Sequence, residues 1–484
     1  MPLPQNILEA LSKRRLPAKE IEKIDKAYEF AKDIHGGQKR FSGEPYFNHI
    51  IRVFENLIDF GVDANTLGAG LLHDTVEDCG ISPGTIEKEF GKDVSNLVQG
   101  VSKLGTIKYK GRERYAENLR HLFIATAEDA RVILIKLADR LDNIRTLQYV
   151  PAHKRGRIAI ETLQIYAPIA NRLGMNRLKT ELEDTAFPYV DSVAYERVRA
   201  LIKERESERK KYIEKVRRSL LKKLSEESMR DIHTEYRIKG YYSIYRKLLR
   251  HDMDEGSLYD IYALRVVVPK IEDCYRVLGI IHGMWKPLPG RIKDYIANPK
   301  LNGYQSLHTT VFTGDGGIAE IQVRTDDMHK EAEFGIAAHL IYKEHGVTKK
   351  ASAVKKQLTW LSRVRDVHDE SEEPEDFLNN LTFDFFDKRI FVFTPDGDVI
   401  ELPKGASALD FAYSIHSYIG NHTSGAKVNG KFVSLDKELK SGDIVEIETK
   451  KSGKPTRKWI DYAKTTLARK HIRAGLRALG DKKN

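Results

Sequence analysis

The chain has 484 residues, of which 41% are hydrophobic and 31% are charged. This length is enough for about three domains, and the composition is typical of a soluble globular protein with a highly charged surface. There is no apolar run long enough for a membrane span, and the N-terminus lacks the apolar core of a signal peptide. The two cysteines, Cys79 and Cys274, are far apart, which argues against a disulfide framework. We therefore expect a protein of a reducing compartment, the cytoplasm, without a membrane partner.

The formal net charge of +11 is concentrated at the C-terminal end of the chain. Residues 450–484 hold twelve Lys or Arg and two Asp, which leaves a balance of +1 for the rest of the chain. The body is therefore not a general nucleic-acid coat, whereas the tail is a candidate contact for a polyanion.

Apolar residues recur at three- and four-residue spacing through residues 1–195, which predicts an all-helical domain. Residues 199–224 are densely charged with an apolar seam, a pattern that predicts a long helix connecting two domains. Residues 262–268 and 318–323 are typical of strands, with helical patterns between and after them. We therefore expect a mixed α/β domain over about residues 200–345.

Residues 366–376 are acidic and have the composition of a linker. Short strand patterns follow at residues 389–393, 399–402, 427–428 and 444–447, with one helical stretch at 408–418. This order predicts a small β-grasp-like module over residues 386–449, followed by a helical basic tail.

The stretch Leu71 to Asp78 reads LLHDTVED. His73 and Asp74 are a potential metal-ligand pair, and Glu77 and Asp78 each lie four residues further on. If this stretch is one helix, all four side chains lie on one side of it, where a cation would offset the cost of burying them. The sequence leaves two interpretations of this stretch alone: a metal-dependent hydrolytic site or an acidic, solvated helix end.

Two further clusters favour the metal site. His49 follows a Gly/Pro turn at the start of an apolar helix, and Asp139, Asn143 and Thr146 share one face of a later helix. A histidine, then His-Asp, then a distant Asp on a helical background is the ligand order of HD-type metal phosphohydrolases, which this segment resembles. Two His and two Asp can hold one divalent cation, manganese rather than a zinc of the sulfur-rich structural kind, and leave room for water and a phosphate oxygen.

The α/β domain contains a second candidate site. Basic residues cluster before, within and after its first strand pattern, and two carboxylates, Asp260 and Glu320, stand among them. A carboxylate pair surrounded by Lys and Arg suits magnesium-dependent phosphoryl transfer, and Tyr304 could offer an aromatic face to a base. The chain has no GxxxxGK[ST] motif, which excludes a P-loop enzyme. The alternative interpretation is a basic, solvated surface.

Many ordered motifs identify a resemblance to the long RelA/SpoT homologues, which make and destroy the guanosine alarmone (p)ppGpp. They include HGGQKRFSGEPYFNH, LLHDTVED, KLADRLDN, YSIYRK, PGRIKDYIANPKLNGYQSLHTT, EIQVRT and DFAYSIHSYIGN. The resemblance implies an all-α HD-type hydrolase domain at 1–195 and an α/β nucleotidyltransferase-like synthetase domain at 196–345. It further implies a helical acidic linker at 346–385, a β-grasp TGS domain at 386–449 and a basic helical tail at 450–484.

The resemblance also implies roles for individual residues. In the hydrolase, the manganese ligands would be His49, His73, Asp74 and Asp139. Glu77 and Asp78 would activate water, and Arg40, Asn143 and Thr146 would bind nucleotide. In the synthetase, Asp260 and Glu320 would bind magnesium and act in catalysis. The residues implied in binding ATP and GDP or GTP are Arg237, Lys239, Lys247, Arg265, Lys293, Lys300, Asn302, Tyr304 and His308. In the TGS domain, His416 would meet the 3′ end of tRNA.

The intact LLHDTVED stretch and the basic loop at 291–294 match the bifunctional class of the family rather than the synthetase-only class. We therefore expect a bifunctional enzyme, a (p)ppGpp 3′-diphosphatase and GTP/GDP pyrophosphokinase, with tRNA and the ribosome as further partners. Gly240 and Asp142 each stand where the family often has His. The family usually continues beyond the TGS domain, so we expect either a shortened or a naturally short member. The alternatives are a hydrolase with a degraded synthetase and a tRNA- or ribosome-binding regulator without turnover.

Overall fold

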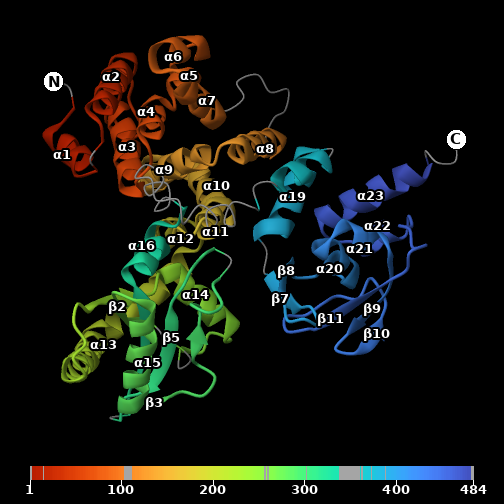
Figure 1. Cartoon of the computed structure of the whole chain (residues 1–484). Coiled ribbons are helices and arrows are strands. Elements are labelled where there is room, and N and C mark those ends of the chain that lie inside the picture. The colour runs from red at the N-terminus through yellow and green to blue at the C-terminus, as the bar shows by residue number, and fades with distance from the viewer. Residues whose placement is uncertain are drawn as a thin grey trace. The chain divides into compact units, whose positions relative to one another are not determined.

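A computed structural model describes residues 3–14, 16–102, 112–255, 258, 261–300, 302–314, 316–336, 360, 363–371, 373–386 and 389–480. Asp260 lies outside these ranges. The chain forms two compact units, one of residues 1–99 and 134–357 and the other of residues 100–133 and 358–484. Figure 1 labels the elements of both units. Within the described residues, no helix has the length and apolar character that crossing a membrane requires.

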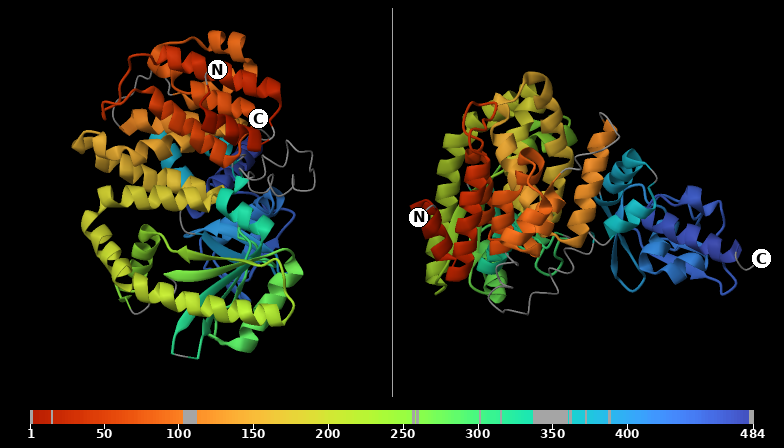
Figure 2. Two further views of the ribbon diagram at one scale, coloured as in Figure 1. Left: turned by 90° about the vertical axis from the view of Figure 1, so that its left-hand side faces the viewer. Right: turned by 90° about the horizontal axis from the view of Figure 1, so that it is seen from above.

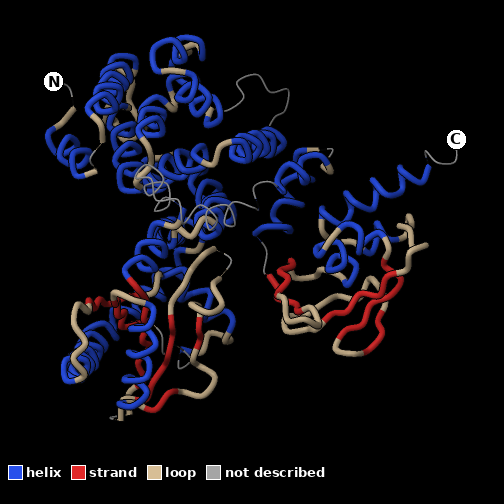
Figure 3. The backbone as a smooth tube through the Cα atoms, in the orientation of Figure 1, coloured by secondary structure: helices blue, strands red, loops and turns tan. Residues whose placement is uncertain are grey.

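The N-terminal part of the first unit is helical. Its helices are α1 (Gln5–Lys13), α2 (Ala18–Ile34), α3 (Phe47–Phe60), α4 (Ala64–Leu72), α5 (Thr75–Cys79), α6 (Pro83–Phe90), α7 (Lys92–Val101), α9 (Arg131–Arg145), α10 (Ala152–Glu161), α11 (Ala167–Arg172), α12 (Asn176–Val190) and α13 (Ser192–Glu226). A 3₁₀ turn (Leu147–Tyr149) and a π-helical turn (Thr162–Tyr166) complete the series. In the described part of the chain up to Glu226, every regular element is helical, which confirms the predicted all-helical domain (Figure 3).

The apolar face of α3 explains how this helical domain packs. Ile50, Val53, Phe54 and Leu57 recur at helical spacing and are fully buried. Helix α4 lies against α3 at Gly70, where an added Cβ would come within 2.2 Å of a Leu57 methyl carbon. The close approach brings the end of α4, and hence His73 and Asp74, beside the start of α3.

The first unit continues with the mixed α/β domain. Its elements are β1 (His233–Ile238), α14 (Tyr241–Arg250), β2 (Tyr262–Val268), α15 (Ile271–Met284), β3 (Lys286–Pro287), β4 (Lys293–Asp294), β5 (Leu307–Phe312), β6 (Ile318–Thr325) and α16 (Asp326–Phe334). The sheet has the order β1-β2-β6-β5-β3, with β4 also paired to β5, and only β2 and β6 run parallel. The long helix α13 packs against β2, α14 and α15, and Figure 2 shows it running along this domain. The predicted connecting helix and α/β domain are thus confirmed.

The second unit contains α8 (Arg112–Glu128), α19 (Pro374–Leu381), a π-helical turn (Thr382–Phe386) and the C-terminal elements. These are β7 (Arg389–Phe393), β8 (Val399–Pro403), α20 (Ala408–Ile415), α21 (Ser417–Asn421), β9 (Thr423–Val428), β10 (Lys431–Val433), β11 (Val445–Thr449), α22 (Trp459–Tyr462) and α23 (Thr466–Gly480). Strands β10, β9 and β11 form one antiparallel sheet and β7 pairs with β8. Helix α20 covers them with an apolar face that includes the fully buried Phe411, as a β-grasp module requires.

Candidate active sites

The stretch around His73 and Asp74 is a break between two helices rather than one helix. Helix α4 ends at Leu72 and α5 begins at Thr75, so His73 and Asp74 are the residues of the joint. His73 Nδ1 lies 2.7 Å from the carbonyl oxygen of Gly70, and the Thr75 hydroxyl donates to the carbonyl of Leu72. Because these side chains take carbonyl groups that a continuing helix would use, they favour the break. It turns His73 and Asp74 inward and leaves Glu77 and Asp78 exposed.

Three side chains converge at this joint. His49, His73 and Asp74 form a group whose ligand atoms all lie within 4.8 Å of one another. Asp74 Oδ2 is 3.1 Å from His73 Nε2 and 3.6 Å from His49 Nε2. Asp139 Oδ1 on α9 is 3.5 Å from His49 Nε2, although Asp139 is outside the 4.8 Å group. Two atoms that each lie about 2.1 Å from one cation are about 3.0 Å apart at a right angle and about 3.4 Å apart at a tetrahedral angle.

The imidazole orientations also suit a cation. His73 Nε2 is buried and makes no hydrogen bond with any described residue, although Asp74 lies beside it. The Nδ1 atoms of both histidines are held elsewhere, that of His73 by Gly70 and that of His49 by Asp142 at 2.7 Å. Burial lowers the pKa of His49, but hydrogen bonds with Asp142 and Asp74 outweigh it and raise that pKa to about 9. The Nε2 atoms of the two histidines and the carboxylates of Asp74 and Asp139 are therefore a set of ligand atoms suited to a divalent cation.

Residues that sequence reasoning assigned no role surround this cluster. The Tyr46 hydroxyl lies 2.7 Å from Asp74 Oδ2 and 2.9 Å from Asp78 Oδ2, so it can donate to either carboxylate. Lys136 Nζ donates to Asp139 Oδ2 at 2.8 Å from a largely buried position. Tyr46 adjoins the predicted His49 in the sequence, but the chain alone gave no indication of its bond to Asp74.

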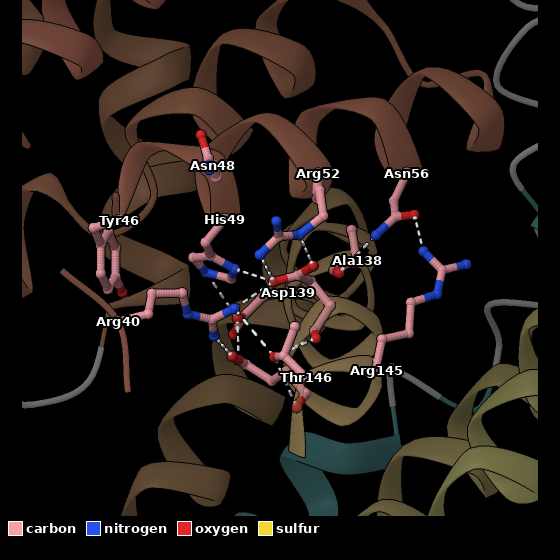
Figure 4. A network of polar contacts seen from close by, with 12 residues as sticks. Arg40, Tyr46, Asn48, His49, Arg52, Asn56, Ala138, Asp139, Arg145 and Thr146 are labelled. Atoms are coloured by element: carbon pink, nitrogen blue, oxygen red, sulfur yellow. Dashed lines mark hydrogen bonds and ion pairs between the residues drawn. The ribbon is translucent and has the colours of Figure 1, made fainter. Parts of the chain in front are cut away.

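The three predicted nucleotide-binding residues of the helical domain lie together. Arg40 Nη1 donates to Thr146 Oγ1 at 3.1 Å and to Asp142 Oδ2 at 2.7 Å, and Nη2 donates to Asn143 Oδ1. Figure 4 shows Arg40, His49 and Arg52 directed toward the segment that carries Asp139 and Thr146. The loop, α3 and α9 thus bring the predicted ligands and the predicted nucleotide contacts into one region.

The second candidate site is a cavity of about 250 Å³ on the α/β domain. The predicted residues that line it are Arg237, Lys239, Lys247, Lys293, Lys300, His308 and Glu320. Leu288, Arg291, Tyr295, Thr310 and Gln322 contribute as well. Among the described residues of this lining, Glu320 is the one carboxylate beside six cationic side chains, a balance that suits a polyphosphate with a cation.

The cationic side chains influence one another. Lys300 Nζ lies 4.5 Å from the ring centre of Tyr295 and 4.9 Å from that of Tyr304. Although much of Lys300 is exposed, desolvation at its ammonium group and repulsion from Lys293 and Arg237 lower its pKa to about 8. His308 Nδ1 lies 3.5 Å from Glu320 Oε1, and burial lowers the pKa of that imidazole. The cavity is thus poised to take up negative charge.

Three predicted nucleotide contacts are placed differently. Arg265 is 7% exposed and ion-paired with Glu235 and Glu333, outside the cavity lining. Tyr304 is 8% exposed, with its hydroxyl 2.8 Å from His308 Nε2. Asn302 Nδ2 donates to the carbonyl of Asn171 in the helical domain. Tyr295 is the tyrosine among the described lining residues of the cavity, and no pattern in the sequence sets it apart.

In the second unit, His416 is exposed at the start of α21, where its Nδ1 accepts the backbone N–H of Tyr418 at 3.1 Å. The exposed Tyr418 ring stacks on His422, with ring centres 4.1 Å apart. Exposed aromatic rings of this kind are suited to stacking with bases.

Comparison with known proteins agrees with this division. Residues 27–176 match the HD domain, residues 236–347 match the region found in RelA / SpoT proteins, and residues 390–449 match the TGS domain. The chain is 46% identical, over 94% of its own length and 65% of the relative's, to a guanosine-3′,5′-bis(diphosphate) 3′-pyrophosphohydrolase from Aquifex aeolicus. It is 44% identical to a GTP pyrophosphokinase from Streptomyces coelicolor, again over 94% of its own length but 55% of the relative's.

A third relative is covered to a greater extent. The chain is 42% identical over 98% of its own length and 67% of the relative's to the bifunctional (p)ppGpp synthase/hydrolase SpoT of Escherichia coli. The chain thus spans between about half and two thirds of the length of these curated relatives. With these three domain matches and 42% identity over almost its whole length to a relative that it covers to two thirds, the chain belongs to the RelA/SpoT family.

Proposed function

We propose that this chain removes the 3′-pyrophosphate of (p)ppGpp in its helical domain and makes the same nucleotide in its α/β domain. The first reaction would give GDP or GTP and pyrophosphate, and the second would transfer pyrophosphate from ATP to the 3′-hydroxyl of GDP or GTP, with AMP as the leaving group. The observation that carries the proposal is the convergence of His49, His73 and Asp74 in one buried cluster, in a chain that also has a cationic cavity. The names of the curated relatives include both activities.

In the hydrolase, we propose His49, His73, Asp74 and Asp139 as ligands of manganese. When bound, the metal would supply Lewis acidity to the phosphate and to the attacking water. The exposed Glu77 and Asp78 would accept the proton of that water, with Asp78 held by the Tyr46 hydroxyl. Arg40, Asn143 and Thr146 would contact the nucleotide.

In the synthetase, we propose that the lysines of the cavity neutralise the phosphates of ATP. Lys239, Lys247 and Lys293 line one continuous site with Lys300. Glu320 would accept the proton of the 3′-hydroxyl and, with Asp260, hold magnesium. Family resemblance alone supports Asp260. The nearby Arg237 would meet the adenine, and Arg265, Asn302, Tyr304 and His308 would hold the nucleotides directly or through neighbouring side chains.

We also propose the domain limits given by the resemblance: hydrolase to residue 195, synthetase to 345, linker to 385, TGS domain to 449 and then the tail. The exposed His416 and the Tyr418–His422 stack support a contact with the 3′ end of tRNA. The ribosome would be a partner through the same unit. We place these activities in the cytoplasm, in keeping with two free cysteines in the described residues.

Two assays on two variants test the proposal. Protein is incubated with ATP and GDP plus magnesium, and separately with ppGpp plus manganese, and the nucleotides are resolved. His73→Ala is expected to abolish hydrolysis alone, and Glu320→Gln synthesis alone. Loss of synthesis in a folded His73→Ala variant would overturn the two-site assignment. Turnover in the manganese assay alone would support the hydrolase with a degraded synthetase, and turnover in neither would support the regulator without activity.

A further inference from the structure

Asp142 lies at the point where the predicted metal cluster meets the predicted nucleotide contacts. It follows the proposed ligand Asp139 by three positions on α9, and it is fully buried. A buried carboxylate of this kind is costly unless several donors surround it.

Three donors surround it. Asp142 Oδ2 accepts a hydrogen bond from His49 Nδ1 at 2.7 Å and another from Arg40 Nη1 at 2.7 Å. Oδ1 accepts from Arg52 Nε. Figure 4 shows the donors' side chains, with Arg52 and His49 descending from the same helix and Arg40 from the preceding loop. The Asp142 carboxylate on α9 thus binds side chains of the Arg40 loop and of α3, which lie 90 to 102 positions earlier in the sequence.

The bond to His49 fixes the chemistry of the other ring nitrogen. Because the Asp142 side chain already accepts from Arg40 and Arg52, Nδ1 of His49 is assigned as a donor to it, and Nε2 is the ring nitrogen left to bind a cation. This Nε2 atom lies 3.6 Å from Asp74 Oδ2 and 3.5 Å from Asp139 Oδ1. A carboxylate behind a histidine ligand orients the ring and raises its basicity.

The hydrogen bonds between Asp142 and the two arginines hold the loop that carries Arg40. Arg52 donates to Glu44 at 2.7 Å and 3.0 Å as well as to Asp142, and the backbone N–H of Arg40 donates to the carbonyl of Glu44. The loop that carries Arg40 is therefore fixed at Glu44 through Arg52 and at Arg40 through Asp142. A neutral imidazole, the usual side chain of the family at this position, offers one acceptor and could not take three donors.

We propose that Asp142 is a positioning residue of the hydrolase that holds His49 in its metal-binding tautomer and Arg40 in place for the nucleotide. The inference rests on the proposed function. The Asp142 side chain thus influences both the affinity of the metal site and the position of the loop that carries Arg40. Arg52 contacts both the Asp142 carboxylate and Glu44 of this loop, and so links the two.

Manganese affinity, measured on the metal-stripped full chain by the electron paramagnetic resonance signal of free Mn²⁺, tests this role without turnover. Asp142→Asn is expected to weaken Mn²⁺ binding about 10- to 100-fold. The kcat of hydrolysis is expected to recover at saturating Mn²⁺, while KM for ppGpp stays raised because Arg40 loses its ion pair with Asp142 and keeps only its hydrogen bonds with Asn143 and Thr146. Synthesis by the same polypeptide, measured with ATP and GDP, reports that the variant has folded.

Arg52→Gln keeps the bond between Asp142 and His49 and removes the anchor of the loop. It is expected to raise KM for ppGpp with little change in Mn²⁺ affinity. Glu181→Gln is the matched control. Glu181 pairs with Arg145 at the end of α9, the helix of Asp142, and no described contact joins Glu181 to His49, Arg40 or Arg52.

If Asp142→Asn lowers thermal stability but binds Mn²⁺ like the unmodified protein, Asp142 has a structural role only and the proposal is wrong. The same conclusion follows if Arg52→Gln and Asp142→Asn affect Mn²⁺ affinity equally. If the unmodified chain binds Mn²⁺ but releases no pyrophosphate from ppGpp, the proposed function fails, and the affinity measurements still decide the role of Asp142.

Discussion

The carboxylate of Asp184 accepts a hydrogen bond from the backbone N–H of Tyr242 at 2.9 Å. Asp184 belongs to α12 of the helical domain, whereas Tyr242 lies in the first turn of α14 of the α/β domain. Helix α14 also carries Lys247, which lines the synthetase cavity. A side chain of one proposed enzyme thus caps a helix that serves the other, as capping residues do within a single domain.

Gly240 leaves the space that this cap needs. A Cβ added at Gly240 would lie 2.7 Å from Thr180 Cγ2 and 2.9 Å from Asp184 Oδ2. Gly240→Ala is therefore expected to displace Asp184, to cost about 1 kcal/mol of stability as a lost cap does, and to lower synthesis more than hydrolysis. Calorimetry and the two nucleotide assays measure these effects.

Gly279→Ala is the control for that substitution, because an added Cβ at Gly279 in α15 has no described atom within 4 Å. It is expected to leave both activities unchanged. If Gly240→Ala keeps full synthesis, the cap does not contribute to the synthetase site. The usual histidine of the family at this position would meet the same two side chains, so Gly240→His is expected to have at least the effect of Gly240→Ala.

The same carboxylate predicts a pH dependence of stability. Burial raises the pKa of Asp184 to about 6, although the backbone N–H groups of Tyr242 and Tyr241 oppose the shift. The folded chain therefore binds this proton at higher pH than the unfolded chain, whose carboxyl has its ordinary value. The resulting stabilisation is present below the unfolded pKa and is lost as the pH rises through about 6.

Asp184→Asn removes this titration and keeps an oxygen that can accept the Tyr242 N–H. As the pH rises from 5.0 to 7.5, the melting temperature of the unmodified protein is expected to fall relative to that of the variant, as differential scanning calorimetry would measure. Asp33→Asn, at an exposed position of α2, is the control and is expected to change the two melting temperatures equally. If Asp184→Asn changes the melting temperature by the same amount at pH 5.0 and at pH 7.5, the carboxyl of Asp184 does not titrate in this range.

Tyr46 provides a prediction for the hydrolase. Its hydroxyl lies between the proposed ligand Asp74 and the proposed proton acceptor Asp78, while its ring stacks on His35. Tyr46→Phe keeps the ring and removes the hydroxyl, so kcat of hydrolysis is expected to fall about tenfold with synthesis unchanged. Tyr28→Phe, the same change at a buried ring that packs on Phe47, is the control. Equal hydrolysis by both variants would remove Tyr46 from the mechanism.

The sequence predicts the proposed ligands more readily than the residues that orient them. His49, His73, Asp74 and Asp139 are polar residues within or at the end of apolar helical patterns, so the sequence alone indicates them. Asp142 is equally polar, but its role depends on hydrogen-bond donors that lie 90 to 102 positions away in the sequence. A local sequence pattern does not indicate which distant residues will be neighbours once the helices have packed.

Strand β5 illustrates a different limit. Its sequence, Leu307 to Phe312, contains a histidine and two threonines and was not predicted as a strand. In the structure the burial of β5 alternates, with His308 and Thr310 facing the cavity and Leu307 and Val311 in the core. The polar positions that obscure the strand pattern are the ones that line the proposed active site.

The basic tail gives the last prediction. Helix α23 carries Arg469, Lys470, Arg473 and Arg477, which the sequence suggests as a polyanion contact. Within the same unit, Lys470 Nζ lies 2.7 Å from Asp366 and 3.3 Å from Asp369, and Arg473 pairs with Glu370. The acidic segment at residues 366–370 thus pairs with two of the four cationic side chains of α23.

Neutralising this acidic segment is therefore expected to strengthen binding of a polyanion to the second unit. The triple variant Asp366→Asn, Asp369→Asn, Glu370→Gln frees Lys470 and Arg473, so tRNA binding at low salt is expected to tighten. The slope of log affinity against log salt should steepen by about 1 to 2, since each phosphate contact releases about one counterion. Fluorescence anisotropy of labelled tRNA over a salt series measures both quantities.

A charge-matched control separates this local effect from the change in net charge. Asp396→Asn, Asp398→Asn and Asp436→Asn remove the same three charges from exposed positions of the β-grasp module, where no described ion pair joins them to α23. If that variant strengthens tRNA binding as much as the first, net charge alone is responsible. A larger effect at residues 366–370, abolished by adding Lys470→Gln and Arg473→Gln, would mean that the acidic segment competes directly with the polyanion for those two side chains.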